Sequence, residues 1–415
     1  MHWNAISRRF LSCVSLLLLP FFGAGCVTRT KAPPPPLILI SMDGFRWDYL
    51  DLFPDQSANL RAMAREGVRA EGLIPVYPSN TFPSHYSIAT GLYPSRSGIV
   101  NNRMFDAELG LFFQYNQRAS VSDPRWWGGE PIWVTAAKAG RASACSFWIG
   151  SEAPVQGHRP TYWKPYDYSI PFEQRLEELI GWLRRPPAER PAVIAFYLEE
   201  TNSIGHKFGP AAPEVAEAVR LLDGRLGALR ARIAKEGFVC NYVVVSDHGM
   251  TACGPDRVVL LDDYIDLRTV QIDFDESAGG LRPNPGTAVE DVVSALRRMP
   301  HMSVYRSHEL PAHFRIDPDS PRVPPIWIVP DEGWNIMTRA RFEKAQPVFS
   351  KGQHGYDPAL LTMHGILVAQ GPDVRAGRTV PRVENIHVYN LLCALSGLKP
   401  ARNDGDNRLV RAAVR

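Results

Sequence analysis

The sequence has almost no excess of either charge. Its 46 lysines and arginines face 43 aspartates and glutamates, which leaves a formal net charge of +3 over 415 residues. So small and dispersed an excess does not indicate a nucleic-acid-binding protein. No internal repeat is found either. Hydrophobic residues make up 45% of the chain and charged residues 21%, as in ordinary folded proteins, and the length suits one large domain or two smaller ones.

Cysteine is scarce, and its spacing argues against two kinds of site. No pair has the C-x-x-C spacing of a zinc knuckle or a redox dithiol. Cys145 and Cys393 lie in apolar runs, where an isolated cysteine usually behaves as a small core residue. The sequence does not determine whether disulfides form. The six cysteines are Cys13, Cys26, Cys145, Cys240, Cys253 and Cys393.

The apolar run from Phe10 to Phe22 is too short to span a membrane, but its length suits a signal peptide. It ends in Gly23-Ala24-Gly25-Cys26, which resembles a bacterial lipoprotein cleavage box, although Gly23 stands where leucine is usual. We predict a signal peptide over residues 1–26, with lipidation at Cys26 or ordinary cleavage as the alternatives. Residues 27–36 then form a stiff Pro-rich linker. Either alternative implies export, to the periplasm or to an outer-membrane-anchored lipoprotein.

Apolar runs bounded by turn residues alternate with helical patterns along the chain. This alternation predicts an α/β fold with a mostly parallel sheet covered by helices on both faces. The residues from about 254 to 348 are rich in Pro, Asp and Gly, and we interpret them as a smaller α+β subdomain inserted into a catalytic domain at 37–405. The expected strands are 36–42, 192–198, 241–245 and 365–369, and the expected helices are 172–183, 215–233, 288–299 and 388–396.

Carboxylates and imidazoles follow the expected strands directly. Asp43 comes after the first strand, and Asp247 and His248 follow the third. Ligands of such sheets gather at the carboxyl ends of the strands, and Asp and His are the usual ligands of zinc. His206 and His354 lie beside glycines that allow close approach of the backbone. Each residue alone has an ordinary alternative, a capping aspartate or a structural histidine, and we assign His85 and His364 to such supporting roles.

Thr81 is the candidate nucleophile. It is predicted to be the N-cap of a helix whose first turn contains Pro83. The free amides and the dipole of a helix N-terminus favour an alkoxide and an incoming phosphate, and a metal would lower the pKa of the hydroxyl. An ordinary capping threonine is the alternative for this motif in isolation. Together with the scattered ligands, Thr81 indicates a two-metal phosphoester hydrolase.

Longer motifs identify a family resemblance. Residues 81–94 read Thr-Phe-Pro-x-His-Tyr-x-x-x-Thr-Gly-Leu-Tyr-Pro, residues 147–152 Phe-Trp-x-Gly-Ser-Glu, and residues 205–210 Gly-His-Lys-x-Gly-Pro. Val-Tyr-Asn-Leu at 388–391 and Gly-Leu-Lys-Pro at 397–400 complete the set. From about Leu37 to Gly405 the chain resembles the nucleotide pyrophosphatase/phosphodiesterase family of the alkaline phosphatase superfamily.

The resemblance implies a site with two divalent ions, expected to be Zn²⁺, and it implies a role for each of the matching residues. One ion would be held by Asp43, Asp247, His248 and the Thr81 oxygen, and the other by His206, His354 and an aspartate four residues before His206. Thr81 would form a phospho-threonine intermediate. Asn102 would donate a hydrogen bond to a phosphate oxygen. The aromatic residues expected to hold a base or another substrate group are Phe82, Trp163 and Tyr197.

One departure from the family pattern keeps several functions open. The expected aspartate is Asn202, and a neutral amide is a weaker zinc ligand than a carboxylate. The leading hypothesis is a nucleotide phosphodiesterase or pyrophosphatase. The alternatives are a choline- or lipid-head-group phosphodiesterase, and a metal-impaired, non-catalytic nucleotide-binding envelope protein. We expect a monomer that binds a nucleotide or another small phosphodiester, and contact with a membrane only through a lipid at Cys26.

Overall fold

An eight-stranded sheet forms the centre of the protein. The computed structural model describes residues 34–415, so the predicted signal peptide and the first part of the linker lie outside the described residues. The strands lie side by side in the order β19-β2-β18-β9-β1-β8-β6-β7. Their bounds in that order are Arg378–Val380, Val68–Ala70, Leu367–Gln370, Asn241–Val245, Leu37–Met42, Val193–Leu198, Ser143–Ser146 and Tyr162–Lys164.

The central strands are apolar because both of their faces are covered. All residues of β1, β8 and β9 are buried, and the three strands pair in parallel with Leu37 opposite both Val193 and Asn241. Successive side chains point to opposite faces, so Ile38 and Ile40 belong to one hydrophobic core and Leu37 and Leu39 to another. The α/β fold predicted from the sequence is confirmed.

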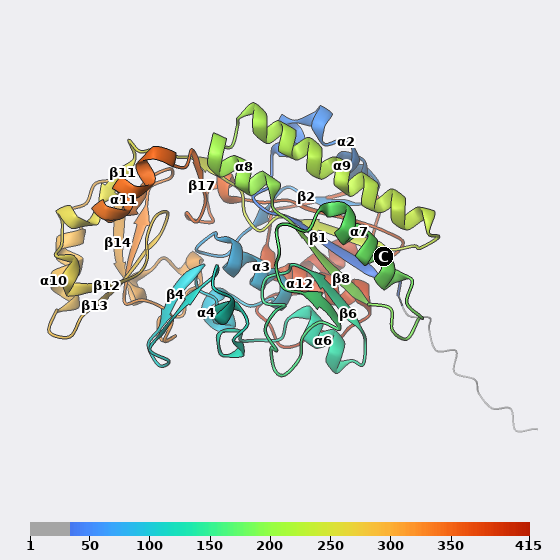
Figure 1. The fold of residues 1–415 in the computed structure, drawn as a ribbon, viewed down its shortest axis with the longest axis horizontal. Helices are drawn as coiled ribbons and strands as arrows, with labels where there is room; N and C mark the ends of the chain where they lie inside the picture. Colours follow the sequence, from blue (N-terminus) through green and yellow to red (C-terminus); the bar gives the residue numbers. More distant parts are fainter. Residues whose placement is uncertain (1–33) are drawn as a thin grey trace, which may run out of the picture. The chain divides into compact units, whose positions relative to one another are not determined.

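Helices cover the two faces of the sheet (Figure 1). One core is closed by α2 (Ala58–Glu66), α7 (Phe172–Leu183) and α9 (Pro213–Lys235). The other is closed by α3 (Thr81–Thr90), α6 (Ile132–Lys138) and α12 (Val388–Ser396). None of the helices within residues 34–415 is both long and apolar enough to cross a membrane.

Strand β18 is the exception to the parallel arrangement, because it pairs antiparallel with both β9 and β2. The chain reaches β18 from the loop that carries His354, at the edge where β9 ends. The backbone N–H of Ser246, just after β9, donates to Ile366 O at 3.1 Å, just before β18. A strand that enters the sheet at the carboxyl ends of its neighbours must run in the opposite direction.

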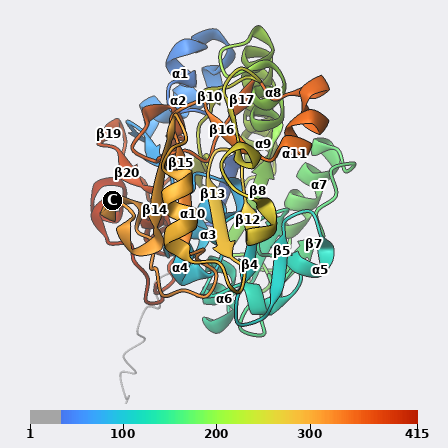
Figure 2. The same ribbon diagram turned by 90° about the vertical axis from the view of Figure 1, so that its left-hand side faces the viewer.

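The segment expected to be an insertion builds a second, four-stranded sheet (Figure 2). The strand order is β12-β13-β15-β14, all antiparallel, and the apolar side packs on α10 (Val289–Leu296). Arg103 donates hydrogen bonds from the hairpin β4–β5 to the carbonyls of Ile272 and Asp273 in β12. The strand bounds are Val270–Phe274, Gly279–Pro283, Ile326–Pro330 and Met302–Arg306 for the sheet, and Arg103–Asp106 and Leu111–Gln114 for the hairpin.

The four cysteines of the described chain are all buried and free, and burial was expected for Cys145 and Cys393.

Short elements complete the fold. The remaining helices are α1 (Tyr49–Leu52), α4 (Pro94–Ser97), α5 (Arg118–Val121), α8 (Glu200–Phe208), α11 (Arg339–Ala345) and α13 (Arg408–Ala413). The remaining strands are β3 (Leu73–Ile74), β10 (Thr251–Ala252), β11 (Val258–Leu260), β16 (Asn335–Met337), β17 (Gly352–Gln353) and β20 (Val383–Glu384).

Candidate active site

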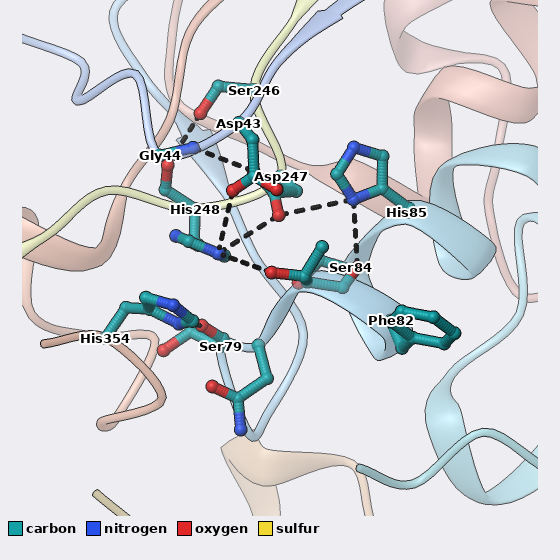
Figure 3. Close-up of polar contacts among 12 residues, drawn as sticks. Asp43, Gly44, Ser79, Phe82, Ser84, His85, Ser246, Asp247, His248 and His354 are labelled. Carbon is teal, nitrogen blue, oxygen red and sulfur yellow. Dashed lines mark hydrogen bonds and ion pairs between the residues drawn. The ribbon is translucent and has the colours of Figure 1, made fainter. Parts of the chain in front are cut away.

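Three of the expected metal ligands meet where β1 and β9 end (Figure 3). Asp43 directly follows β1, and Asp247 and His248 follow β9 after one serine. All three side chains are completely buried, and their candidate ligand atoms lie within 4.8 Å of one another. Gly44 permits this turn, because its φ is +66° and a Cβ atom there would lie 3.0 Å from the Cα of Asn202. The parallel register therefore brings the three residues together.

The charges of this group fit a bound cation. Oδ1 of Asp43 and Oδ2 of Asp247 are buried and accept no hydrogen bond that would satisfy them. Burial, together with the neighbouring Asp247, raises the pKa of Asp43 well above its usual value. Burial opposes ionisation of Asp247 too, but His248 and His85 outweigh it and hold the pKa of Asp247 well below its usual range. Two orphaned carboxylate oxygens beside an imidazole are a donor set that suits a divalent metal ion.

The orientation of His248 supports the same conclusion. Its Nδ1 lies 2.8 Å from the carbonyl oxygen of Gly249, and because a carbonyl oxygen can only accept, Nδ1 donates and Nε2 is the ring atom left for a metal ion. That Nε2 lies 3.0 Å from Asp247 Oδ2 and 3.5 Å from Asp43 Oδ1. The ring nitrogen and the two carboxylate oxygens therefore converge as the ligands of one metal ion do.

Thr81 lies within reach of this group. Its Oγ1 is 3.3 Å from Nε2 of His248. The sequence-based prediction that Thr81 is the N-cap is wrong by one residue. Asn80 is the N-cap, with extended backbone, its carbonyl accepting from Ser84 N at 3.0 Å, and Thr81 is the first residue of α3. The consequence for the chemistry is small, because the hydroxyl still lies in the first turn of α3, where the helix dipole favours negative charge.

A second group contains His206, His354 and Asn202. Nδ1 of His206 lies 2.8 Å from Gly352 O, and Nδ1 of His354 lies 3.1 Å from Ser79 O, so both rings keep Nε2 unprotonated. Burial lowers the pKa of His206 to about 4, and burial with the neighbouring His248 and His206 lowers that of His354 strongly. Both histidines are therefore neutral, as metal ligands must be.

The two groups adjoin each other through His354. Its ring stacks on that of His248, with centroids 3.6 Å apart, and lies 5.0 Å from the ring centroid of His206. Oδ1 of Asn202 is buried without a hydrogen-bond partner, like the orphaned carboxylate oxygens of the first group. A free amide oxygen beside two neutral imidazoles is a usable, though uncharged, ligand set.

His85, expected to have a supporting role, connects the nucleophile to a ligand. Its Nδ1 lies 2.9 Å from the carbonyl oxygen of Thr81 and 3.2 Å from Oδ2 of Asp247 (Figure 3). Its Nε2 lies 2.7 Å from Ser41 Oγ. The side chain is fully buried. His85 therefore holds the first turn of α3 against the end of β9.

A cavity of about 540 Å³ opens over these residues. Its wall includes Asp43, Thr81, Asn202, His206 and His354, so Asp43 of the first group and all three residues of the second group face the same space. Tyr197 also lines it and donates from its hydroxyl to Oδ2 of Asp43 at 2.5 Å. The other large side chains of the wall are Phe82, Tyr115, Phe147, Trp148 and Tyr166.

Asn102 lies in the cavity wall, just before β4, and its amide has a defined orientation. Its Oδ1 accepts a hydrogen bond from the backbone N–H of Phe82 at 3.0 Å. Because this contact occupies the oxygen, the Nδ2 donor is left for a ligand in the cavity. Phe82 packs beside the cavity on the rings of Phe113 and Tyr115.

The structure does not bring Trp163 to the cavity. Trp163 lies on the edge strand β7, opposite Cys145 of β6, and the guanidinium of Arg159 covers its ring at 5.1 Å. Tyr166, three residues later, lines the cavity instead. Pro165 ends the strand between the two positions, and the chain then turns towards the carboxyl edge of the sheet. The rule that ligands gather at strand ends, applied to β7, would have found Tyr166.

Two carboxylates that the sequence reasoning missed also line the cavity. Glu199, one residue beyond β8, accepts a hydrogen bond from the hydroxyl of Tyr166. Oε1 of Glu152 accepts from the backbone N–H of Tyr166 at 2.9 Å. Glu199 also follows a strand end, whereas Glu152 lies in an irregular loop, at the last position of the motif at residues 147–152.

Comparisons with known proteins agree with this geometry. The sequence profile described as Type I phosphodiesterase / nucleotide pyrophosphatase matches residues 37–357. The chain belongs to this family. The family is metal-dependent, and the buried Asp and His cluster of this chain has the ligand types for a metal ion. The solved structure of murine ectonucleotide pyrophosphatase/phosphodiesterase 5 is similar with a TM-score of 0.85 and 32% identity, covering 92% of this chain and 100% of the other. This similarity confirms the alkaline-phosphatase-like fold.

Curated relatives are similar over most of this chain. A venom phosphodiesterase of Crotalus durissus collilineatus is 35% identical over 387 residues, which are 89% of this chain and 45% of the relative. A bis(5'-adenosyl)-triphosphatase of Xenopus laevis is 34% identical over 381 residues, which are 91% of this chain and 81% of the relative. The chain thus spans less than half the length of the venom enzyme.

Proposed function

We propose that this protein is an exported, metal-dependent phosphodiesterase that cleaves phosphodiester or pyrophosphate bonds of nucleotides and releases nucleoside monophosphates. One observation carries the proposal. The Thr81 hydroxyl lies in the first turn of α3, 3.3 Å from a buried imidazole, and opens into a cavity with acidic, histidine and aromatic walls. A hydroxyl at a helix N-terminus beside a metal-type donor set suits attack on a phosphoryl group.

The proposed reaction has two steps. Thr81 Oγ1 forms a bond to phosphorus and gives its proton to solvent, while the bond from phosphorus to the leaving-group oxygen breaks and that oxygen departs with the electron pair. The product of this step is a phospho-threonine that still carries the nucleoside. Water then attacks the same phosphorus and gives up a proton, the bond to Thr81 Oγ1 breaks, this oxygen takes up a proton again, and the nucleoside monophosphate leaves.

Two metal ions, zinc by the nature of the donors, belong to the proposal. Asp43, Asp247, His248 and Thr81 would hold one, and His206, His354 and Asn202 would hold the other, more weakly. Bound metal lowers the pKa of the attacking hydroxyl and offsets the charge that develops on the phosphoryl oxygens. The protein itself orients the donors: Tyr197 holds Asp43 through its hydroxyl, and backbone carbonyls hold the three histidines.

The protein also stabilises the phosphoryl group directly. The Nδ2 of Asn102 would donate to a non-bridging oxygen, because Phe82 N already binds the other end of the amide. The dipole of α3 points its positive end towards the same space and favours negative charge there.

A nucleotide is the preferred substrate because aromatic side chains line the cavity. Phe82 and Tyr166 line the cavity, and aromatic faces stack on nucleobases. An inactive form of the murine relative was solved in complex with AMP, and other relatives are named as nucleotide pyrophosphatases. These names support the substrate class proposed for this chain.

A second candidate is a choline-type head group. Glu152 and Glu199 place two carboxylates next to the rings of Phe147 and Tyr166, a combination that also suits a quaternary ammonium. The carboxylate of Glu199 already accepts a hydrogen bond from the Tyr166 hydroxyl. We therefore favour a nucleotide over a choline-type head group as the substrate.

Hydrolysis of the 4-nitrophenyl ester of thymidine 5′-monophosphate by zinc-loaded protein tests the proposal, with the 4-nitrophenyl ester of phosphocholine assayed in parallel. The proposal predicts turnover of the nucleotide ester. Turnover of the phosphocholine ester alone would shift the substrate to lipid head groups. Failure on both would favour the non-catalytic alternative, with Asn202 as its physical cause.

Export and anchoring remain part of the proposal, because residues 1–33 lie outside the described chain. Metabolic labelling with palmitate in a bacterial host tests the lipid anchor. The native sequence should take up label and Cys26→Ser should not. Unlabelled native protein released into the soluble periplasm would support ordinary signal cleavage instead.

A further inference from the structure

Arg175, in α7, is a buried cation with no carboxylate bound to it among residues 34–415. The residue is only 9% exposed. Burying an unpaired charge is costly, so such a residue needs other partners. Its Nε donates to Ser146 Oγ at 3.0 Å, and its Nη2 donates to the carbonyl oxygen of Tyr197 at 2.5 Å. Arg175 thereby joins the carboxyl ends of the neighbouring strands β6 and β8.

Two aromatic rings complete the surroundings of this guanidinium. The ring centroids of Phe147 and Phe196 each lie 4.4 Å from the Arg175 Cζ, on different elements. Burial lowers the pKa of Arg175 to about 10, so the side chain stays charged at neutral pH. Cation–π attraction is strongest where water is excluded, as it is here.

Phe147 has an unusual backbone conformation. Its φ is +69°, in the left-handed region that L-residues with large side chains avoid. This conformation occurs at the residue that follows β6, and Phe147 lines the catalytic cavity. Arg175 packs on the ring that this backbone directs towards the cavity.

Phe147 in turn supports Tyr166. Their ring centroids lie 5.3 Å apart in an edge-to-face arrangement. Tyr166 is held from two other sides, by Glu152 at its backbone N–H and by Glu199 at its hydroxyl. The aromatic wall, by which we mean Phe147 and Tyr166, is therefore one connected assembly whose buried end is Arg175.

We propose that Arg175 is a positioning residue that sets the affinity of the cavity for the nucleoside part of the substrate, through the aromatic wall. This inference rests on the proposed function. Arg175 touches no reacting atom. It acts on the base-binding side, so its loss should weaken binding of nucleotides and leave the phosphoryl chemistry intact.

The test compares Arg175→Lys with Arg190→Lys in zinc-loaded protein. Arg190 is a matched control, because it also donates to backbone carbonyls, of Leu183 and Arg185, and also covers an aromatic ring, that of Phe238. It lies near the start of β8, at the opposite end of the sheet from the cavity. Lysine keeps the charge in both variants but loses the planar fork and its stacking.

For Arg175→Lys we expect KM for the thymidine 5′-monophosphate ester to rise by about five- to tenfold, the size of one lost stacking contact. Its kcat, and both constants for bis(4-nitrophenyl) phosphate, should stay within about twofold of the native protein. Arg190→Lys should leave KM and kcat unchanged for both substrates. A wild-type KM for Arg175→Lys, or an equal fall of kcat on both substrates, would overturn the inference.

Two additions keep the test decisive. If Arg175→Lys does not fold, Phe147→Leu takes its place, because it removes the ring that Arg175 covers. This variant should show the same rise in KM with kcat unchanged. An unchanged KM would show that the aromatic wall does not contribute to nucleotide binding. If the native protein hydrolyses neither ester, the proposed function fails, and calorimetric titration with AMP replaces the kinetics. Weaker AMP binding by Arg175→Lys than by Arg190→Lys would then support the inference, and equal binding would refute it.

Discussion

Asn202 is the residue at which the proposed second metal site is weakest. The family resemblance implies an aspartate there, but Asn202 supplies a neutral amide, whose buried Oδ1 has no hydrogen-bond partner, in the same cavity wall as two neutral histidines. The second group of ligands therefore contributes no negative charge of its own, whereas the first contributes two carboxylates. Because zinc is divalent, the second group should bind it less tightly.

Asn202→Asp should consequently raise the zinc content of the protein. The carboxylate restores one negative charge without changing the shape of the side chain. We expect about one zinc per chain in the native protein and about two in the variant after dialysis against limiting zinc, measured by plasma mass spectrometry. Equal zinc content in the two proteins would show that the amide is an adequate ligand. Asn116→Asp, in the same cavity wall, is the control for added charge alone.

Tyr166 and Trp163 differ in position although they are close in sequence. The resemblance indicated Trp163, while the structure has Tyr166 in the cavity and Trp163 on the edge strand under Arg159. The metal-type residues were easier to predict because each comes directly after an apolar strand or beside a glycine. The direction of an aromatic ring depends on how β7 ends, which no periodicity reveals.

Tyr166→Ala should therefore raise KM for nucleotide esters by about tenfold, as expected for a lost stacking partner. Trp163→Ala is the matched control, and it should leave KM within about twofold because its ring lies outside the cavity. Steady-state kinetics on the thymidine ester measure both. A larger effect of Trp163→Ala would restore the original assignment.

The helices and strands could be predicted from the sequence better than the pairing of the strands. The apolar runs that form β1, β8 and β9 are uninterrupted, and the α7 pattern gave the helix its observed bounds, 172–183. The antiparallel direction of β18 and the four-stranded sheet of the insertion were not predictable, because both depend on contacts between segments far apart in the chain. Short strands such as β4 and β5 carry too few residues for a pattern.

Helix α9 provides a direct measure of how much the sheet core contributes to stability. Leu222 is fully buried against the sheet, whereas its neighbour Leu221 is 46% exposed. Leu222→Ala should lower the free energy of unfolding by about 2–5 kcal/mol, and Leu221→Ala by less than about 1 kcal/mol. Urea denaturation followed by circular dichroism compares them. Similar midpoints for the two variants would contradict the assigned packing.

The architecture as a unit explains how one cavity collects residues from distant segments. The parallel strands bring Asp43 and Asp247 to one edge, and the antiparallel β18 follows the loop that brings His354 to the same edge. The insertion holds the hairpin after Asn102 through Arg103. The site is thus assembled only when both cores of the sheet have formed, so folding and metal binding should be coupled.

Removal of metal should therefore lower the melting temperature of the protein. Metal binds the folded chain and stabilises it, by about 4 kcal/mol when free zinc exceeds the dissociation constant a thousandfold. Differential scanning calorimetry before and after chelation measures the loss, and added zinc should restore it. The melting temperature of Asp247→Asn should change much less on chelation, because this variant lacks one of the two carboxylates of the first group and so binds less metal. An unchanged melting temperature on chelation of the native protein would contradict the coupling.

Attack of the Thr81 hydroxyl on phosphorus is tested by measuring turnover of the thymidine ester and AMP binding with the same Thr81→Ala protein. Turnover should fall by at least about a thousandfold, because the reacting atom is gone. AMP binding should stay within about threefold, because Asn102 and the aromatic wall are unchanged. Turnover close to that of the native enzyme would show that Thr81 is not the nucleophile, whatever the metal content.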